Sequence, residues 1–104
     1  MLYLYKLGGM KMQFKLSERS PKHFAFEYEK DGEKLAEIEW TERDQVMDMT
    51  HTYVSDALRG QGVAKKLLDK AADYARENQY KMNGICSYVV SAFEKSDAYN
   101  DVKA

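Results

Sequence analysis

The chain has 104 residues, with 16 basic and 17 acidic side chains and a formal net charge of −1. This length fits one domain, and the balanced charge argues against nucleic-acid binding as its main task. A composition that is 44% hydrophobic with one proline is typical of a packed globule. The single cysteine, Cys86, excludes an internal disulfide and favours a reducing, cytoplasmic compartment. No apolar run approaches the ~20 residues that span a bilayer, so no membrane partner is expected.

Residues 1–10 are expected to be an extension in front of a single domain that spans residues 11–104. The apolar opening segment is too short to span a membrane, and it lacks the small-residue cleavage site of a signal peptide. Gly8-Gly9 then interrupts it. The first element of the domain is therefore expected after residue 10.

Alternating apolar and polar residues predict an antiparallel meander in the first half of the domain. Asp31-Gly32 predicts a tight hairpin turn, because glycine adopts positive φ without steric cost. Polar segments over residues 17–22 and 41–45 predict two further connections. The expected strands span residues 11–16, 24–29, 34–40 and 46–54.

The alternation also assigns the two faces of the strand over residues 34–40. Ala36, Ile38 and Trp40 are expected to point into the core. Glu37 and Glu39 are expected on the opposite, solvated face, where they could also attract a cationic ligand.

Residues 61–78 carry the strongest helix pattern, with apolar side chains recurring along one side. Lys70 is expected on its outer face, and Lys65 and Asp69 are spaced for an i,i+4 ion pair. A short strand over residues 81–86 follows. Strand, helix and strand in this order predict a right-handed parallel crossover.

The C-terminal part is expected to hold one more short helix, capped by Ser87 and spanning residues 88–95, and a loosely held tail over residues 96–104. The predicted fold class is therefore α+β. It is a mixed sheet in which an antiparallel meander is followed by one βαβ unit and a short C-terminal helix.

The segment Arg59-Gly60-Gln61-Gly62-Val63-Ala64 joins the last meander strand to the long helix and predicts a phosphate site. The first turn of a helix leaves about four N–H groups unpaired and carries roughly half a positive charge. Gly60 and Gly62 lack side chains that would keep a pyrophosphate from these donors. Arg59 and Lys65 add positive charge nearby.

Two familiar phosphate motifs do not fit this segment. A P-loop requires Gly-x-x-x-x-Gly-Lys followed by Ser or Thr, and the chain contains no such string. A dinucleotide-binding loop requires a small residue at its third glycine position, where this chain has Lys65.

The segment does resemble the Gln/Arg-x-x-Gly-x-Gly/Ala signature of the GNAT superfamily of N-acetyltransferases. His51-Thr52-Tyr53-Val54 before it and Cys86-Ser87-Tyr88-Val89 after the next strand resemble a compact subgroup of short GNAT-like proteins. The resemblance covers about residues 24–93. It implies a GNAT-like fold, acetyl-CoA as the cofactor, an amine of unknown identity as the acceptor, and pyrophosphate binding by residues 59–65.

The chain departs from the superfamily's pattern at three points. Ser55 stands where proline is common, and Ala64 stands where a second glycine is common, although alanine is a permitted variant. The chain also has no room for the helices that follow the first strand in full-length members and usually shape the acceptor pocket. The resemblance therefore does not identify the acceptor.

The resemblance further implies that the pantetheine arm lies between the two splayed parallel strands, along the backbone of Tyr53 and Val54, where a strand N–H can stabilise an oxyanion. His51 on the same strand is a candidate general base, because imidazole titrates near neutral pH. The alternative for His51 is a hydrogen-bonded, half-buried histidine.

Cys86 is a candidate nucleophile, because a helix N-terminus favours the thiolate. The alternative for Cys86 is a small buried hydrophobic residue, and most members of the superfamily are thought to transfer the acetyl group directly. Tyr88 or Tyr99 is a candidate acid toward the coenzyme thiolate. No metal ligands are predicted.

Two other functional classes stay open. One is a module that binds coenzyme A or acetyl-CoA with vestigial or no activity, and the other is an interaction domain without a cofactor. The sequence predicts neither the oligomeric state nor the acceptor.

Overall fold

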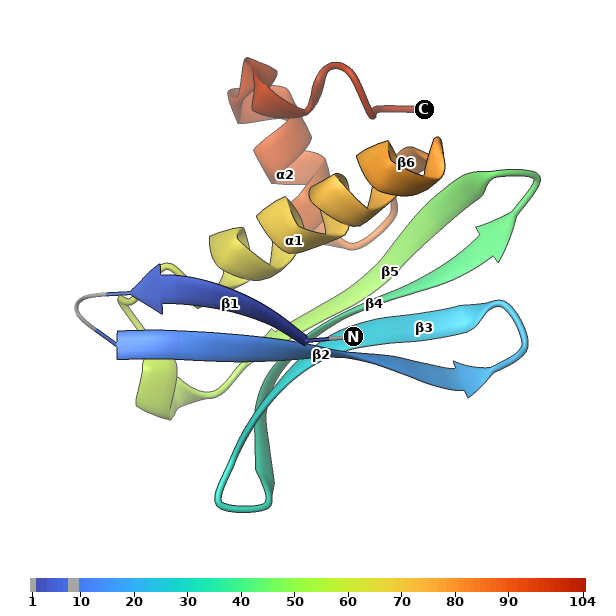
Figure 1. Cartoon of the computed structure of the whole chain (residues 1–104). Helices are drawn as coiled ribbons and strands as arrows, with labels where there is room; N and C mark the ends of the chain where they lie inside the picture. Colours follow the sequence, from blue (N-terminus) through green and yellow to red (C-terminus); the bar gives the residue numbers. More distant parts are fainter. Residues whose placement is uncertain (1, 8–9) are drawn as a thin grey trace.

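The computed structural model describes residues 2–7 and 10–104, with side chains from Met12 onward. Its elements are β1 (Leu2–Leu7), β2 (Met10–Ser20), β3 (His23–Lys30), β4 (Glu33–Arg43), β5 (Val46–Val54), the 3-10 helix η1 (Asp56–Leu58), α1 (Val63–Asn78), β6 (Lys81–Gly84), α2 (Ser87–Lys95) and the 3-10 helix η2 (Asp97–Tyr99). The strands form one sheet in sequence order, antiparallel from β1 to β5 and parallel between β5 and β6. Figure 1 shows α1 crossing one face of this sheet. The predicted α+β class, with its meander and single βαβ unit, is confirmed.

Two of the three predicted connections between strands are shorter in the structure than expected, and the third is as expected. Asp31-Gly32 forms a two-residue turn with positive φ at both positions, as expected. The predicted connection over residues 41–45 is wrong, because β4 continues to Arg43 and only Asp44 and Gln45 turn, again with positive φ at both. The predicted turn over residues 17–22 is also too long, because β2 pairs with β3 as far as Ser20.

The core lies between the sheet and α1, and its centre is aromatic. Trp40 is fully buried, with ring centroids 5.4 Å from Phe26 and 5.3 Å from Tyr74. The indole N–H of Trp40 and the hydroxyl of Tyr74 both donate to Glu42, at 3.0 and 3.1 Å. Buried Trp40 and half-buried Tyr74 therefore keep their apolar contacts while their polar atoms have a partner.

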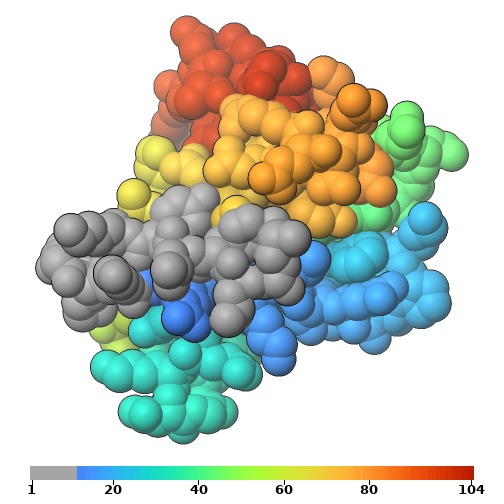
Figure 2. Space-filling model, viewed as in Figure 1, coloured from blue at the N-terminus to red at the C-terminus, as the bar shows by residue number. Residues whose placement is uncertain are grey.

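Two expectations about α1 and the C-terminal tail are wrong. Lys70 is 4% exposed instead of lying on the outer face of α1, and burial lowers its pKa. The tail is held firmly, because Val102 is buried and its carbonyl accepts the Met82 N–H at 2.6 Å, while Asp101 pairs with Arg76. Figure 2 shows the C-terminal segment packed against α1. The tail therefore completes the core beside β6.

β1 lies in the segment expected to be an extension. All six of its residues pair with β2, from Leu2 opposite Lys15 to Leu7 opposite Met10. β1 is thus an edge strand of the sheet, while the domain boundary at residue 10 stays a prediction. No helix in the described ranges is long and apolar enough to cross a membrane.

Candidate active site

The loop in front of α1 turns at the two glycines that the sequence pattern singled out. Gly60 and Gly62 have φ of 82° and 71°, a region that side-chain-bearing residues adopt only with strain. The first bond of the helix runs from the Lys66 N–H to the Gly62 carbonyl at 3.1 Å. The N–H groups of Val63 and Ala64, which precede it, therefore have no partner within the helix. No acidic residue lies in the first turn, so the positive end of the helix dipole is not neutralised there.

A cleft of about 230 Å³ lies at this helix start. Ser55 and Leu58 line it although the sequence did not single them out. Ser55 caps η1 through its hydroxyl, and Leu58 anchors the loop as its one buried residue. The predicted cofactor-binding residues that line the cleft are Val54, Arg59, Gly60, Gly62, Val63 and Ala64.

The other predicted loop residues lie outside this lining. Gln61 is half-buried and donates its N–H to the Leu58 carbonyl at 3.3 Å. Lys65 points along the helix surface to Asp69, at 2.8 Å, which confirms the predicted i,i+4 pair. Arg59 is exposed and pairs with Asp56. The basic side chains near the cleft are thus already paired with carboxylates.

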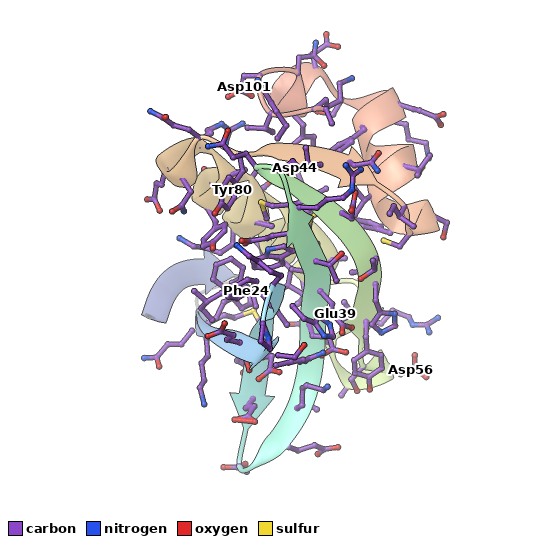
Figure 3. All side chains as sticks on the ribbon, turned by 90° about the vertical axis from the view of Figure 1, so that its right-hand side faces the viewer. Phe24, Glu39, Asp44, Asp56, Tyr80 and Asp101 are labelled. Carbon is purple, nitrogen blue, oxygen red and sulfur yellow. The ribbon has the colours of Figure 1, made fainter. Side chains whose placement is uncertain are left out.

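β5 and β6 separate beside this cleft. Their parallel pairing ends at Met49 and Gly84, and the N–H groups of Ile85 and Cys86 both donate to the Met49 carbonyl, at 3.2 and 2.9 Å. A Cβ at Gly84 would lie 3.4 Å from Val90, so α2 packs directly on the end of β6. β5 runs on for five residues past this point. Figure 3 labels Asp44, which lies in the turn before β5, and Asp56, which lies just after it.

The free edge of β5 can be assigned residue by residue. The Ser55 N–H donates to the Leu35 carbonyl of β4 at 2.7 Å. Hydrogen-bonded and non-bonded pairs alternate along an antiparallel ladder, so the Tyr53 backbone faces β4. Thr52 and Val54 then direct their backbone groups toward the open gap. Tyr53 and Val54 were predicted to have their backbone along the pantetheine arm. The Val54 backbone does face the gap, but the second residue that faces it is Thr52 and not Tyr53.

Cys86 lies at the mouth of the gap and is the N-cap of α2, the position predicted for Ser87. The thiol is half-buried, and its sulfur lies 3.4 Å from the Thr52 hydroxyl across the gap. Cys86 is therefore neither a fully buried core residue nor a freely exposed thiol. It stands where the two parallel strands part.

Three large apolar side chains are exposed near the gap: Tyr53, Ile85 and Val90. Tyr53 lies on the free part of β5, Ile85 follows β6, and Val90 lies on α2. Among residues 12–104 they make up the exposed large hydrophobic residues.

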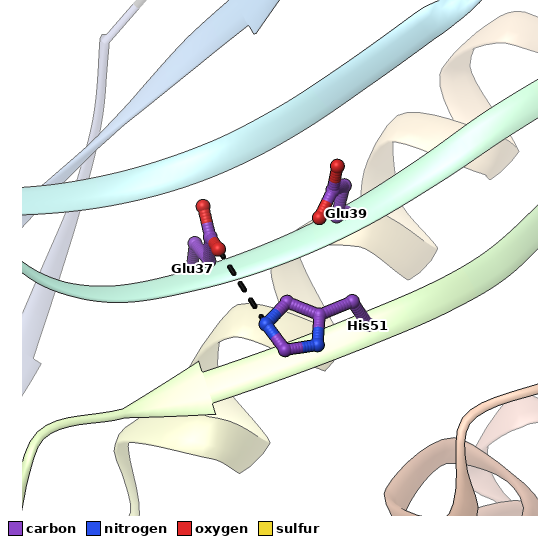
Figure 4. Close-up of side chains that lie close together, drawn as sticks. All are labelled: Glu37, Glu39 and His51. Atoms are coloured by element: carbon purple, nitrogen blue, oxygen red, sulfur yellow. Dashed lines mark ion pairs between the residues drawn. The ribbon is translucent and has the colours of Figure 1, made fainter.

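His51 lies on the face of the sheet away from α1, beside two carboxylates of β4 (Figure 4). Its Nε2 atom lies 3.6 Å from Glu37, and its imidazole is 53% exposed. Glu39 is its partner in the strand register. The predicted general base and the predicted Glu37–Glu39 pair are thus side by side.

This face is less solvated than expected because Arg19 of β2 covers it. The guanidinium pairs with Glu27, Glu37 and Glu39. Burial alone would raise the pKa of Glu37, but hydrogen bonds from Arg19 and Lys34 outweigh it and hold that pKa below its usual range.

Glu37, Glu39 and His51 are also close enough to one another to surround a metal ion. Arg19 and Lys34 already neutralise Glu37, and Arg19 pairs with Glu39 as well. A cation would have to displace these partners, so the described residues do not argue for a metal site.

The two candidate tyrosines occupy different environments. Tyr99 is 3% exposed and donates to Asp69 at 2.5 Å; burial first, and then this carboxylate, raise its pKa far above the usual range. Tyr88 is half-buried, and burial also raises its pKa. Tyr99 is therefore fixed in a structural role.

Asp48 joins β5 to β6 just before they part, and its replacement by asparagine is expected to lower the free energy of unfolding by about 1–2 kcal/mol at pH 7. The buried carboxylate accepts Asn83 at 3.0 Å and Arg43 at 2.8 Å, and these bonds lower its pKa. The contribution of the ionised Asp48 carboxylate to the free energy of unfolding is therefore complete above about pH 4. It is lost as the pH falls through the lowered native pKa. Urea unfolding at pH 7 and pH 3 should show a smaller wild-type advantage at pH 3. An equal advantage at both would contradict this.

Comparison with known proteins agrees with the fold. The family model described as GCN5-related N-acetyl-transferase matches residues 23–102, more than half of the chain. The solution structure of a GCN5-like protein from Staphylococcus aureus is 36% identical and superposes with a TM-score of 0.66, covering 86% of this chain and 87% of that one. A ribosomal-protein-alanine N-acetyltransferase from Brucella melitensis, 24% identical, has a TM-score of 0.60 over 83% of this chain and 64% of its own, which shows the fold alone.

Curated relatives match a shorter stretch. Protein NATD1 of Gallus gallus is 40% identical over 45 residues, which are 43% of this chain and 41% of that protein. The human protein of the same name is 40% identical over the same length. The match thus spans about two fifths of the curated relatives. With the family model, the related structure and the loop geometry together, the chain belongs to the GCN5-related N-acetyltransferase family.

Proposed function

We propose that the protein is an N-acetyltransferase that moves an acetyl group from acetyl-CoA to an amine. The observation that carries this proposal is that the cleft at the start of α1 adjoins the gap between β5 and β6, with Val54 belonging to both. Free N–H groups at the helix start suit a diphosphate. The open edge of β5 suits the amides of a pantetheine arm, which can pair with it as an added strand would.

The chemistry is assigned to two residues on opposite sides of β5. The Cys86 thiolate attacks the thioester carbonyl, and the carbon–sulfur bond to the coenzyme breaks. The amine then attacks the Cys86 thioester, its proton passes to His51, and the Cys86 thiolate leaves. Direct attack of the amine on acetyl-CoA gives the same product and also needs His51. The reducing compartment favoured by the lone thiol makes the cytoplasm the proposed location.

A second candidate function is a binding module for coenzyme A or acetyl-CoA without turnover. It is favoured by the turn between β2 and β3, where two residues, Pro21 and Lys22, stand between the strands. No helices can be built there to enclose an acceptor. Binding without transfer to any amine would support this second function.

Acetyl-CoA is expected to raise the midpoint of thermal unfolding, because a ligand at roughly 100 times its Kd stabilises the native state by about 2.7 kcal/mol. Gly62→Ala is expected to weaken binding about tenfold, since the added methyl group would occupy open space beside the helix start, where the diphosphate is proposed to lie. The measurement is isothermal titration calorimetry with acetyl-CoA on wild-type and variant protein.

Gly32→Ala is the matched control for this experiment. Gly32 has φ of 80° and, like Gly62, open space around an added Cβ, so both variants carry similar backbone strain. Gly32 lies in the hairpin turn between β3 and β4 and does not line the cleft. A wild type that does not bind acetyl-CoA at millimolar concentration would overturn the proposed function. If both variants weakened acetyl-CoA binding equally, the helix start would not be the binding site.

A further inference from the structure

We infer that Glu37 is a positioning residue for His51, holding the imidazole with its basic nitrogen toward the acceptor. This inference rests on the proposed function, in which His51 accepts the proton of the amine. It concerns a carboxylate on β4 that lies behind the candidate base on the sheet face away from α1 (Figure 4).

The Glu37 carboxylate is fixed before any ligand arrives. Its side chain is 8% exposed, and its Oε1 atom accepts Arg19 and, at 2.8 Å, Lys34. Arg19 is in turn held by Glu27 at 2.5 Å. These bonds engage one oxygen and leave Oε2 directed at the His51 ring. Glu37 is thus a rigid, ionised group with one oxygen available.

The contact with His51 selects one ring nitrogen. Nε2 lies 3.6 Å from Glu37 Oε2. This exceeds a normal hydrogen bond, but catalytic contacts are often long without ligand and shorten in the complex. A ring that donates Nε2–H to the carboxylate carries its lone pair on Nδ1. Nδ1 is then the atom that accepts the amine proton.

Glu37, rather than Glu39, has this role. Glu39 is the register partner of His51, yet its Oε2 atom pairs with His23 and with Arg19. A carboxylate oxygen of Glu39 also lies within 4.8 Å of a His51 ring nitrogen, but Oε2 of Glu39 is shared by His23 and Arg19, whereas the ion-pair contact with the ring, at 3.6 Å, is made by Glu37. The charged and titratable groups on this face around His51 are Glu37 and Glu39 of β4, Arg19 of β2, His23 and Glu27 of β3, Lys34 at the start of β4 and Tyr53 of β5.

The experiment is an NMR measurement of the ring nitrogens of His51 at alkaline pH, which reports which nitrogen carries the proton. It is feasible because the chain has two histidines and a His23→Gln variant assigns the signals. The wild type should carry the proton on Nε2, Glu37→Gln should lose this preference, and Glu37→Asp, which keeps the carboxylate, should retain most of it.

Glu27→Gln is the matched control, because Glu27 binds the same Arg19 nitrogen as Glu37. In this variant the proton of the His51 ring should stay on the nitrogen that carries it in the wild type. An unchanged proton position in Glu37→Gln, or an equal change in Glu27→Gln, would overturn the inference.

Activity gives a second readout. For an amine that the wild type acetylates, Glu37→Gln should lower kcat by about tenfold, with KM for acetyl-CoA unchanged. A wild type that binds no acetyl-CoA and acetylates no amine would contradict the proposed function. The NMR measurement would still decide whether Glu37 orients the His51 ring.

Discussion

Replacement of His51 by glutamine is expected to lower kcat for acetyl transfer about 10²-fold, with acetyl-CoA affinity unchanged. An amine acceptor is mostly an ammonium ion near neutral pH, and its proton must leave before or during attack. His51 lies on β5 beside the gap, but its side chain is on the face away from the helices, whereas the cleft lies at the start of α1. The base should therefore matter for transfer and not for cofactor binding.

His23→Gln is the matched control for this substitution. His23 is the other histidine of the chain, and it pairs with Glu39 on the same polar face. Initial rates over a range of pH, with calorimetry for acetyl-CoA binding, separate the two variants. If the His51→Gln variant transferred the acetyl group as fast as the wild type, His51 would not be the general base. An equal loss in both variants would indicate damage to the face as a whole.

Replacement of Cys86 by alanine is expected to abolish the acetyl–enzyme adduct and to lower the transfer rate about 10²-fold or more. Cys86 is the chain's single cysteine, so a thioester found by intact-mass analysis has one possible site. Its sulfur touches the Thr52 hydroxyl at the mouth of the gap and lies at the start of α2. A nucleophile is well placed there.

The Cys86 variant must be compared with wild type in two assays. Intact mass after incubation with acetyl-CoA reports the adduct, and initial rates across several amines report transfer. Equal rates in both proteins would end the nucleophile role and leave direct transfer, with His51 still required. Thermal unfolding of the variant shows whether the fold survives loss of the half-buried thiol.

The features that sequence predicted best are those set by local physics. Asp31-Gly32 forms its turn because both residues take positive φ, and Gly60 and Gly62 were singled out because they lack side chains in front of α1. The strand over residues 46–54 was predicted with its observed bounds, since β-branched and aromatic residues fill it. Local signals of this kind need no knowledge of the rest of the chain.

The features that sequence missed depend on contacts between distant segments. Lys70 has the position of a surface residue in the helix pattern, yet it is buried in the folded chain. The tail looks polar and loose, but Val102 and Tyr99 are buried and the tail pairs with β6. No sequence motif marks Arg19, although its guanidinium pairs with Glu27 of β3 and with Glu37 of β4.

In the candidate site, too, some residues could be predicted from local sequence and others depended on distant segments. The loop residues could be found from their spacing, while Thr52 required the register of β5 on β4, which fixes the residues that face the gap. Ser55 stands in the position of a common proline, and Leu58 is the apolar residue of a polar loop. Those two signals could have marked both as part of the cleft.

A crystal structure with coenzyme A tests the central claim most directly, namely that backbone N–H groups at the start of α1 bind the diphosphate. We expect phosphate oxygens about 2.7–3.2 Å from N–H groups of residues 60–65, and a pantetheine arm along Thr52 and Val54 between β5 and β6. A coenzyme bound elsewhere, or a helix start left empty at saturating coenzyme, would contradict the claim.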